Sequence, residues 1–92
     1  MMQLETTTQF RKDYKRVKKR GYPMEQMKNV LDRLIAGQPL DERNRDHALT
    51  GNYAGFRECH IQPDWLLIYR ISQDRLILVA SQTGTHSDLF DE

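Results

Sequence analysis

The chain has 92 residues, of which 38% are apolar and 29% charged, and its formal net charge is +1. A chain of this length makes one domain, so we expect a single domain over residues 1–92. The longest apolar run, residues 65–69, is far shorter than the roughly 20 residues of a membrane span, and the N-terminal segment lacks the apolar core of a secretory signal. The one cysteine cannot form an internal disulfide. We therefore expect a cytoplasmic protein with no membrane partner.

Basic residues are concentrated in the first part of the chain. Residues 1–37 carry nine Lys or Arg against four Asp or Glu, whereas residues 38–92 carry five against nine. Most of the excess lies in FRKDYKRVKKRG, residues 10–21. A basic helix can attract an anionic partner through its summed surface charge, and a solvated helix face explains the same composition equally well.

The first half of the chain predicts one strand and two helices. Residues 2–6 alternate as in a short strand, and residues 8–20 carry apolar side chains at helical spacing after a threonine that can cap a helix. Gly21 ends the first helix because glycine adopts positive φ readily. A second helix opens at Pro23 and stops at Gly37.

The second half predicts a sheet. After a polar loop over residues 38–46, strands are predicted at residues 55–61, 65–71 and 76–83. Their connections are short, which favours an antiparallel meander. Residues 48–49 fit a further short strand. The order β-α-α-β-β-β predicts an α+β fold in which two N-terminal helices pack on one face of a small antiparallel sheet.

The three histidines fall near predicted strand ends or turns, where a meander can bring them together. Their imidazoles titrate near neutral pH, with an ordinary pKa of about 6.5, and so can give or accept a proton. Asp64 follows the Pro63 turn and can orient one imidazole or take a proton itself. Taken singly, each histidine is more often a hydrogen-bonded or surface residue than a catalyst. The residues concerned are His47, His60, His86 and Asp64.

A metal site made of these four residues is an alternative, since sites with three histidines exist. We expect no metal, because no pair of them has a familiar tight spacing such as HxH or HExxH. Strand alternation also removes Cys59 from the chemistry. Adjacent strand residues point to opposite faces, so Cys59 lies with Arg57, whereas His60 lies with Phe56 and Glu58. Cys59 is therefore interpreted as a small structural residue.

The stretches RDHALTGNYAGFRECHIQPDWLLIYRI, residues 45–71, and TGTHSDLF, residues 83–90, carry a family likeness. Together with the predicted order of elements, they resemble the YafQ branch of the RelE/ParE toxin superfamily. The resemblance implies the toxin of a type II toxin–antitoxin system, a ribosome-dependent mRNA endoribonuclease, or mRNA interferase, that inhibits translation. It implies as partners a cognate antitoxin protein, the 70S ribosome and mRNA in the A site, and it admits operator DNA as a target of the toxin–antitoxin complex.

By this resemblance, His47, His60, Asp64 and His86 occupy the acid–base positions of the family. The implied reaction needs no cofactor: a base takes the proton of the RNA 2′-OH and an acid protonates the departing 5′ oxygen. We expect His86 to be the general acid. His47 or His60 would be the general base, with Asp64 orienting it or sharing its role.

Other site residues are also implied by resemblance. Phe90 and Trp65 match family aromatics; Phe90 would stack on a base or position the RNA, and core packing suits Trp65 at least as well. An arginine commonly precedes TGTH in the family, and this chain has Gln82 there. The lost charge weakens stabilisation of the scissile phosphate, so either another arginine replaces it or cleavage is slow. The candidate replacements are Arg57, Arg45 and Arg70.

Three alternatives stay open from the sequence. A ParE-like toxin would use the same scaffold to bind DNA gyrase without cutting RNA, although binding alone needs no acid–base residues. A weakly active toxin would be kept for antitoxin binding and operon control. A metal-binding or purely structural module is the third. The basic helix could contact ribosomal RNA phosphates or an acidic antitoxin segment.

Overall fold

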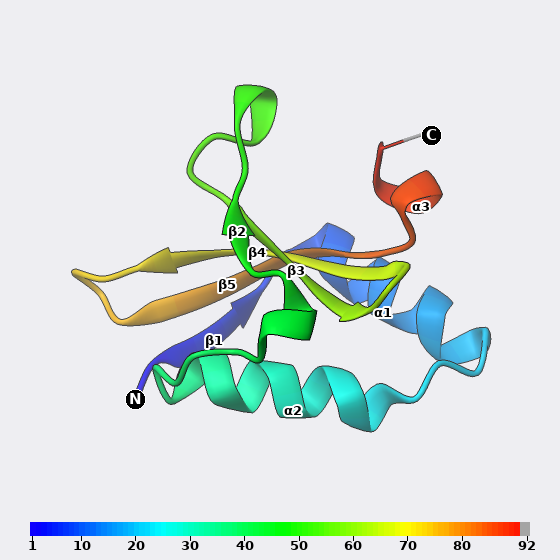
Figure 1. Cartoon of the computed structure of the whole chain (residues 1–92), viewed down its shortest axis with the longest axis horizontal. Helices are drawn as coiled ribbons and strands as arrows, with labels where there is room; N and C mark the ends of the chain where they lie inside the picture. The colour runs from blue at the N-terminus through cyan, green and yellow to red at the C-terminus, as the bar shows by residue number, and fades with distance from the viewer. Residues whose placement is uncertain (91–92) are drawn as a thin grey trace.

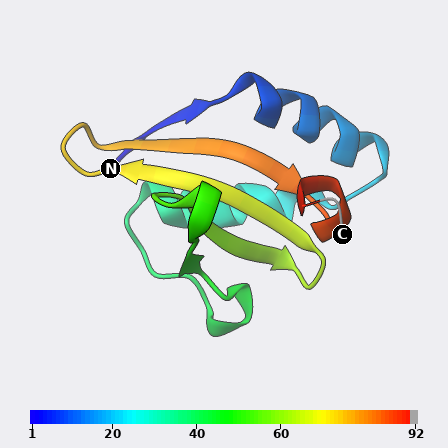
Figure 2. The same cartoon turned by 90° about the horizontal axis from the view of Figure 1, so that it is seen from above.

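A five-stranded sheet carries two long helices on one face, in a computed structural model that describes residues 1–90 (Figures 1 and 2). The elements are β1 (Gln3–Thr6), α1 (Thr8–Lys19), α2 (Met24–Ile35), the 3-10 turn η1 (Glu42–Asn44), β2 (His47–Ala48), the 3-10 turn η2 (Gly51–Tyr53), β3 (Arg57–Gln62), β4 (Trp65–Ser72), β5 (Ile77–Gly84) and α3 (His86–Phe90). The predicted α+β order is confirmed, and α3 is an addition. Among the described residues, no helix is long and apolar enough to cross a membrane.

The sheet has the order β1-β5-β4-β3-β2 and is mixed. The predicted meander of β3, β4 and β5 is antiparallel, but β1 pairs with β5 in parallel, so the expectation of a wholly antiparallel sheet is wrong. β5 offers the free edge of the meander. Parallel pairing there lets the chain run from β1 directly into α1, which packs against β5 (Figure 2).

Helix boundaries follow the signals in the sequence. The Thr7 side chain caps α1 by accepting the Phe10 backbone N–H at 3.0 Å. Gly21 follows α1 with φ of +83°, a conformation that costs other residues energy. α2 begins directly after Pro23, whose fixed φ suits a helix start.

The main core lies between the helices and one face of the sheet. Each large apolar side chain buried there stabilises the fold by about 1.5–3 kcal/mol relative to exposure. Cys59 belongs to this core, as predicted, and burial raises the pKa of its thiol to about 12, which keeps it protonated. The core residues are Phe10, Val17, Met27, Val30, Leu34, Cys59, Trp65, Leu67, Tyr69, Leu78 and Ala80.

The second face of the sheet carries the alternate strand residues, among them Glu58, His60 and Gln82. Leu66 and Ile68 lie on this face and are fully buried. The loop that contains η2 and the helix α3 both project away from α2 (Figure 1). This face is therefore where the C-terminal half of the chain gathers its polar residues.

A β-bulge in β5 decides on which face Gln82 lies. Ala80 and Gln82 pair with consecutive residues of β4, so Ser81 is the extra residue. Without it, the two-residue alternation would place Gln82 on the same face as Ala80, in the helix-packed core. Thr7 fixes the bulge, because its hydroxyl donates to the Ser81 carbonyl at 2.7 Å and its backbone N–H to the Ala80 carbonyl at 3.1 Å.

Candidate active site

Strand register brings the histidines to one end of the second face. His60 pairs with Leu66, and Leu66 pairs with Gly84, so these three residues lie in line across β3, β4 and β5. His86 follows two residues after Gly84, and its ring centroid lies 5.8 Å from that of His60. His47 reaches the same end because β2 pairs with β3.

Asp64 orients His86. Its Oδ1 lies 2.7 Å from His86 Nδ1 and also accepts the His86 backbone N–H at 3.1 Å. The side-chain contact holds the pKa of the Asp64 carboxyl below its ordinary value. Since a carboxylate only accepts, Nδ1 carries a proton and Nε2 is left free. The His86 side chain is 42% exposed, so an incoming ligand can reach that nitrogen.

His60 faces a buried carboxylate. Its Nδ1–H is directed at the Pro63 carbonyl, 3.2 Å away, and its Nε2 lies 3.4 Å from Glu58 Oε1. The Glu58 side chain is only 8% exposed, and the same Oε1 lies 3.8 Å from His47 Nε2. Glu58 therefore sits between two imidazoles. His47 is more exposed and is held by a 2.6 Å contact between its Nδ1 and the Arg45 carbonyl.

Glu58 is the site residue that sequence reasoning missed. Strand alternation places it on the face of His60, and this shared face was the available signal. One atom each of Glu58, His60 and His86 lies within 4.8 Å of the others, and imidazole and carboxylate are ligands of divalent metals. These three residues could hold a metal ion. Sequence spacing did not reveal the set because β3 and α3 supply it from distant positions.

Three half-buried aromatic side chains flank the histidines. The Phe90 ring lies 6.5 Å from the His86 ring and meets Tyr53 edge-on at 5.6 Å. Tyr53 also meets Phe56 edge-on at 6.3 Å, and its hydroxyl donates to Gln82 Oε1 at 3.4 Å. Phe90 thus presents an aromatic surface beside His86, and Gln82 keeps its amide hydrogens available for a ligand.

Two residues expected near RNA lie elsewhere. Trp65 is 1% exposed in the helix-side core, and its indole N–H donates to Thr83 Oγ1 at 2.9 Å, so it is a packing residue. Arg57 follows the parity of Cys59 and points to the helix side, where its Nε contacts Asp46 Oδ1 at 3.3 Å. Strand alternation aims both side chains away from the histidines.

Arg70 behaves differently from Arg57. It alternates with Leu66 and Ile68 onto the second face, and its guanidinium carbon lies 5.5 Å from the centre of the Phe56 ring. A cation over an aromatic ring is held by the charge distribution of the ring. Of the arginines considered as replacements for the charge absent at Gln82, Arg70 lies on the face of the site and Arg57 does not.

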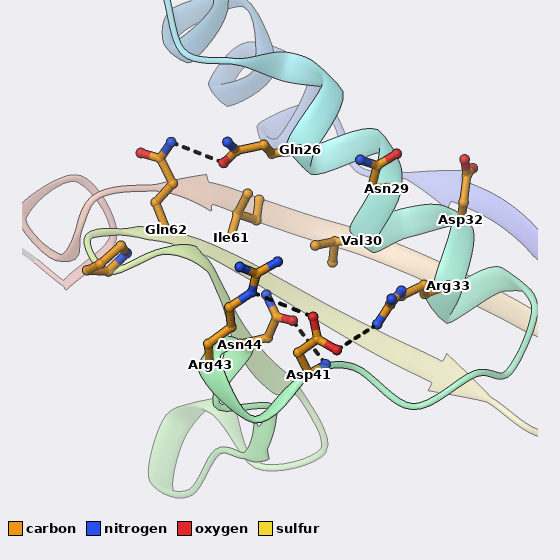
Figure 3. Close-up of a pocket in the computed structure, with 11 residues that line it drawn as sticks. Gln26, Asn29, Val30, Asp32, Arg33, Asp41, Arg43, Asn44, Ile61 and Gln62 are labelled. Carbon is orange, nitrogen blue, oxygen red and sulfur yellow. Dashed lines mark hydrogen bonds and ion pairs between the residues drawn. The ribbon is translucent and has the colours of Figure 1, made fainter.

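A groove of about 790 Å³ opens between α2, η1 and the end of β3 (Figure 3). Three of its charged side chains pair with one another, since Asp41 lies 3.1 Å from Arg33 and 3.6 Å from Arg43. The three histidines do not line it. One wall residue supports the site: the buried Asn44 donates to the His60 carbonyl at 2.7 Å and so fixes the strand at that point.

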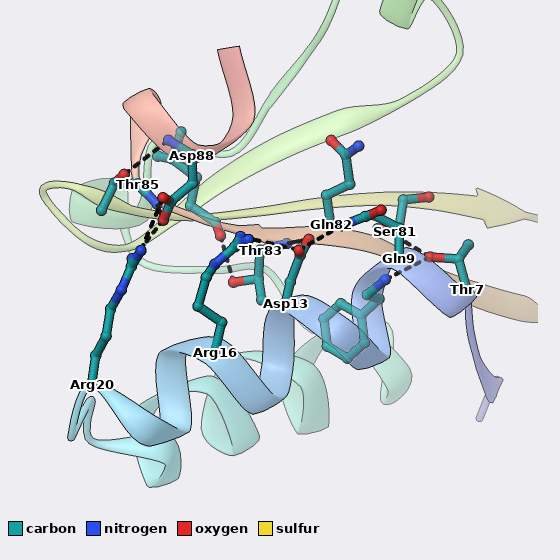
Figure 4. A network of polar contacts seen from close by, with 12 residues as sticks. Thr7, Gln9, Asp13, Arg16, Arg20, Ser81, Gln82, Thr83, Thr85 and Asp88 are labelled. Carbon is teal, nitrogen blue, oxygen red and sulfur yellow. Dashed lines mark hydrogen bonds and ion pairs between the residues drawn. The ribbon is translucent and has the colours of Figure 1, made fainter. Parts of the chain in front are cut away.

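Helix α1 reaches the site end of β5 through polar side chains (Figure 4). Asp13 is 1% exposed, and its Oδ2 accepts the backbone N–H of Thr83 at 3.2 Å. Its Oδ1 accepts from Gln9 at 2.8 Å and from Arg16 at 3.0 Å. Asp13 thereby holds the residue that follows Gln82, on the opposite side of the bulge from Thr7.

Comparison with known proteins finds bacterial toxins that are similar over nearly the whole chain. The family described as the bacterial toxin of type II toxin–antitoxin system, YafQ, matches residues 2–91. The mRNA interferase toxin YafQ of Escherichia coli K12 is 39% identical over 88 residues, which cover 95% of this chain and 94% of that protein.

Solved structures agree in fold. A metal-bound toxin from Helicobacter pylori has a TM-score of 0.92 and 39% identity, covering 98% of this chain and 100% of that one. A chain of the E. coli DinJ–YafQ complex has a TM-score of 0.89 and 36% identity, covering 98% of this chain and 99% of that one. Since the family matches nearly the whole chain, the protein belongs to the YafQ family of toxins from bacterial type II toxin–antitoxin systems.

Proposed function

We propose that this protein is an mRNA endoribonuclease that stops translation by cutting messages in the A site of the 70S ribosome. The observation that carries the proposal is the Asp64–His86 pair, which leaves Nε2 of the His86 imidazole without a partner among the described residues. The centroid of this ring lies 5.8 Å from that of the His60 ring. Two imidazoles at this separation suit the two sides of one phosphodiester. The E. coli relative that bears the name mRNA interferase supports the same reaction.

The proposed cleavage uses the RNA as its own nucleophile. The 2′-OH proton passes to the Glu58–His60 pair, where two acceptor atoms face each other 3.4 Å apart and can share it. The 2′ oxygen bonds to phosphorus and the bond to the 5′ oxygen breaks. His86 enters this step as an imidazolium, keeps its Nδ1 proton on Asp64 and gives its Nε2 proton to the departing oxygen. The products are a 2′,3′-cyclic phosphate and a 5′-OH end. This route needs no metal, and each proton transfer contributes about 10²–10⁴-fold.

Of the two candidate bases, His60 is the better placed. It is next to His86, whereas His47 is more exposed and lies farther from the same Glu58 oxygen, at 3.8 Å. We assign His47 to holding that carboxylate in position. We assign Asp64 to orienting the general acid, since its side chain contacts His86.

Gln82 would bind the phosphate through hydrogen bonds and would contribute no positive charge. Its Oε1 accepts from Tyr53, which turns the amide hydrogens outward as donors. A neutral donor stabilises a developing negative charge less than a guanidinium does, so we expect slow cleavage. Phe90 would stack on a base, and Arg70 supplies the positive charge on this face.

The proposed partners are a cognate antitoxin, the ribosome and mRNA, in the cytoplasm. The E. coli relative forms a DinJ–YafQ complex, which supports an antitoxin partner here. The basic side chains of α1 are largely exposed and fit either ribosomal RNA phosphates or an acidic antitoxin segment. Operator DNA is a proposed target of the toxin–antitoxin complex.

Primer extension on a translated message after induction tests the proposal. We expect codon-phased breaks with the wild type and their loss with His86→Ala. Asp74→Asn, in the exposed β4–β5 turn, is a matched control that should cut normally. Intact messages during growth arrest would contradict cleavage. Gyrase-dependent DNA damage that survives His86→Ala would favour the ParE-like alternative.

The cluster of Glu58, His60 and His86 favours a second role. We propose that a divalent metal bound there inhibits cleavage, because it would occupy the proposed base and acid together. The metal-bound H. pylori toxin supports metal binding in this fold. Cleavage should persist in chelator and fall as zinc or copper is added. Cleavage that requires added metal would reverse this assignment.

A further inference from the structure

We propose that Arg20 is a positioning residue for cleavage and acts through Asp88, which anchors the helix that carries His86; this inference rests on the proposed function. The two residues are 68 positions apart in the sequence: Arg20 caps the C-terminus of α1, and Asp88 lies in α3. Asp88 does not approach the reacting atoms in the scheme above. Its effect would be on the position of the His86 side chain.

Helix α3 needs an anchor. It has five residues, His86–Phe90, and none of them is fully buried. So short a helix is not stable on its own, because nucleation costs more than its few hydrogen bonds return. Yet it carries both His86 and Phe90, two of the residues assigned to RNA. Its position must therefore come from contacts with other elements.

The anchor is a bidentate ion pair (Figure 4). Arg20 Nη1 lies 2.6 Å from Asp88 Oδ2, and Nη2 lies 3.1 Å from Oδ1. Two parallel bonds between guanidinium and carboxylate fix orientation as well as distance. This pairing is also the main reason that the pKa of Asp88 is held well below its ordinary value. Arg20 sits at the C-terminal cap of α1, which itself packs on β5.

The same carboxylate organises the start of α3. Asp88 Oδ2 accepts the Thr85 backbone N–H at 3.0 Å, and Thr85 Oγ1 accepts the Asp88 N–H at 3.0 Å, a reciprocal cap. Asp88 also rests directly on the end of β5, since a Cβ added at Gly84 would lie 2.9 Å from Asp88 Cβ. A shift of Asp88 would thus move the turn that begins with His86, which must meet Asp64 at 2.7 Å.

A direct role for Arg20 in RNA binding is the competing explanation, because its neighbours on α1 are also basic. The pair with Asp88 occupies the two guanidinium nitrogens that would otherwise grip a phosphate. The two explanations predict different effects of a substitution at Asp88. An acidic side chain would not bind phosphate, so only a positioning role predicts that Asp88→Asn lowers cleavage.

A double-mutant cycle separates them, using cleavage of a message on translating ribosomes. Arg20→Ala and Asp88→Asn should each lower kcat about tenfold with little change in KM, since small displacements of a reacting group are costly. The double variant should be no slower than either single one. Arg20→Lys keeps the charge and should recover much of the rate. Arg75→Ala removes a positive charge from the exposed β4–β5 turn and should leave kcat unchanged.

A readout independent of activity accompanies the cycle. NMR signals of the His86 and Phe90 rings should shift in Arg20→Ala and Asp88→Asn, while those of His47 stay in place. The control Arg75→Ala should move none of these signals. Thermal melts verify that each variant is folded. Rate losses that multiply in the double variant, or a loss confined to KM with Asp88→Asn unaffected, would overturn the inference. Wild-type protein that leaves the message intact refutes the proposed function instead.

Discussion

Asp13 gives the sharpest test of how α1 holds β5. Asp13→Ala deprives the Thr83 N–H of its acceptor in a fully buried residue, which costs about 1–3 kcal/mol. Loss of the contact with Arg16, whose side chain is 39% exposed, adds at most about 1 kcal/mol. The higher helix propensity of alanine offsets up to about 0.7 kcal/mol. The free energy of unfolding should fall by about 2 kcal/mol.

For a domain of this size, that loss corresponds to a fall in Tm of about 8–16 °C. Urea unfolding followed by the fluorescence of Trp65, which is buried, measures it directly. The control is Asp32→Ala on α2, whose carboxylate is 57% exposed and pairs with Lys28 on the surface. Its effect should stay within about 0.5 kcal/mol. If Asp13→Ala destabilises no more than Asp32→Ala, the buried carboxylate does not hold β5 and the reasoning fails.

Four further predictions follow from the site. Glu58→Gln should slow cleavage by about 10²-fold or more while the protein stays folded, and an unchanged rate would remove Glu58 from the base. Gln82→Arg should raise the cleavage rate, measured by primer extension, because it restores a cation at the phosphate. Trp65→Phe should lower stability by about 1–2 kcal/mol, measured in urea, with cleavage retained, because the lost contact is to the core. At pH 7, Arg20→Ala should lower the free energy of unfolding by about 1 kcal/mol. Because the folded pKa of Asp88 is depressed, this loss should be present above the unfolded pKa of about 3.9 and vanish as the pH falls through the folded pKa. Thermal melts across pH measure it.

Local signals predicted most of the fold. The Thr7 cap, the glycine after α1 and the short turns of the meander act within a few residues, so the sequence displays them. The parallel pairing of β1 is different, since the order of elements does not determine which edge a strand joins or in which direction. Helix α3 escaped prediction because only five residues form it and distant partners hold it.

The site was predicted unevenly for a related reason. The three histidines and Asp64 could be named from residue type and resemblance, but their pairing depends on register across three strands. That register puts Asp64 on His86 and Glu58 on His60. The bulge at Ser81 reverses the parity of Gln82, so strict alternation would have placed that side chain in the core. For Trp65 the sequence left core packing open beside RNA contact, and its burial favours core packing.

The parallel pairing of β1 with β5 has a consequence for synthesis. Gln3 pairs in register with Ile77, so β1 is synthesised well before its partner and the sheet cannot close until β5 has followed. Pairings between such distant segments also make folding slow. The helix that bears His86 follows β5 and is seated on it. In the proposed function, His86 therefore reaches its place only after β5 has paired with its neighbours in the sheet.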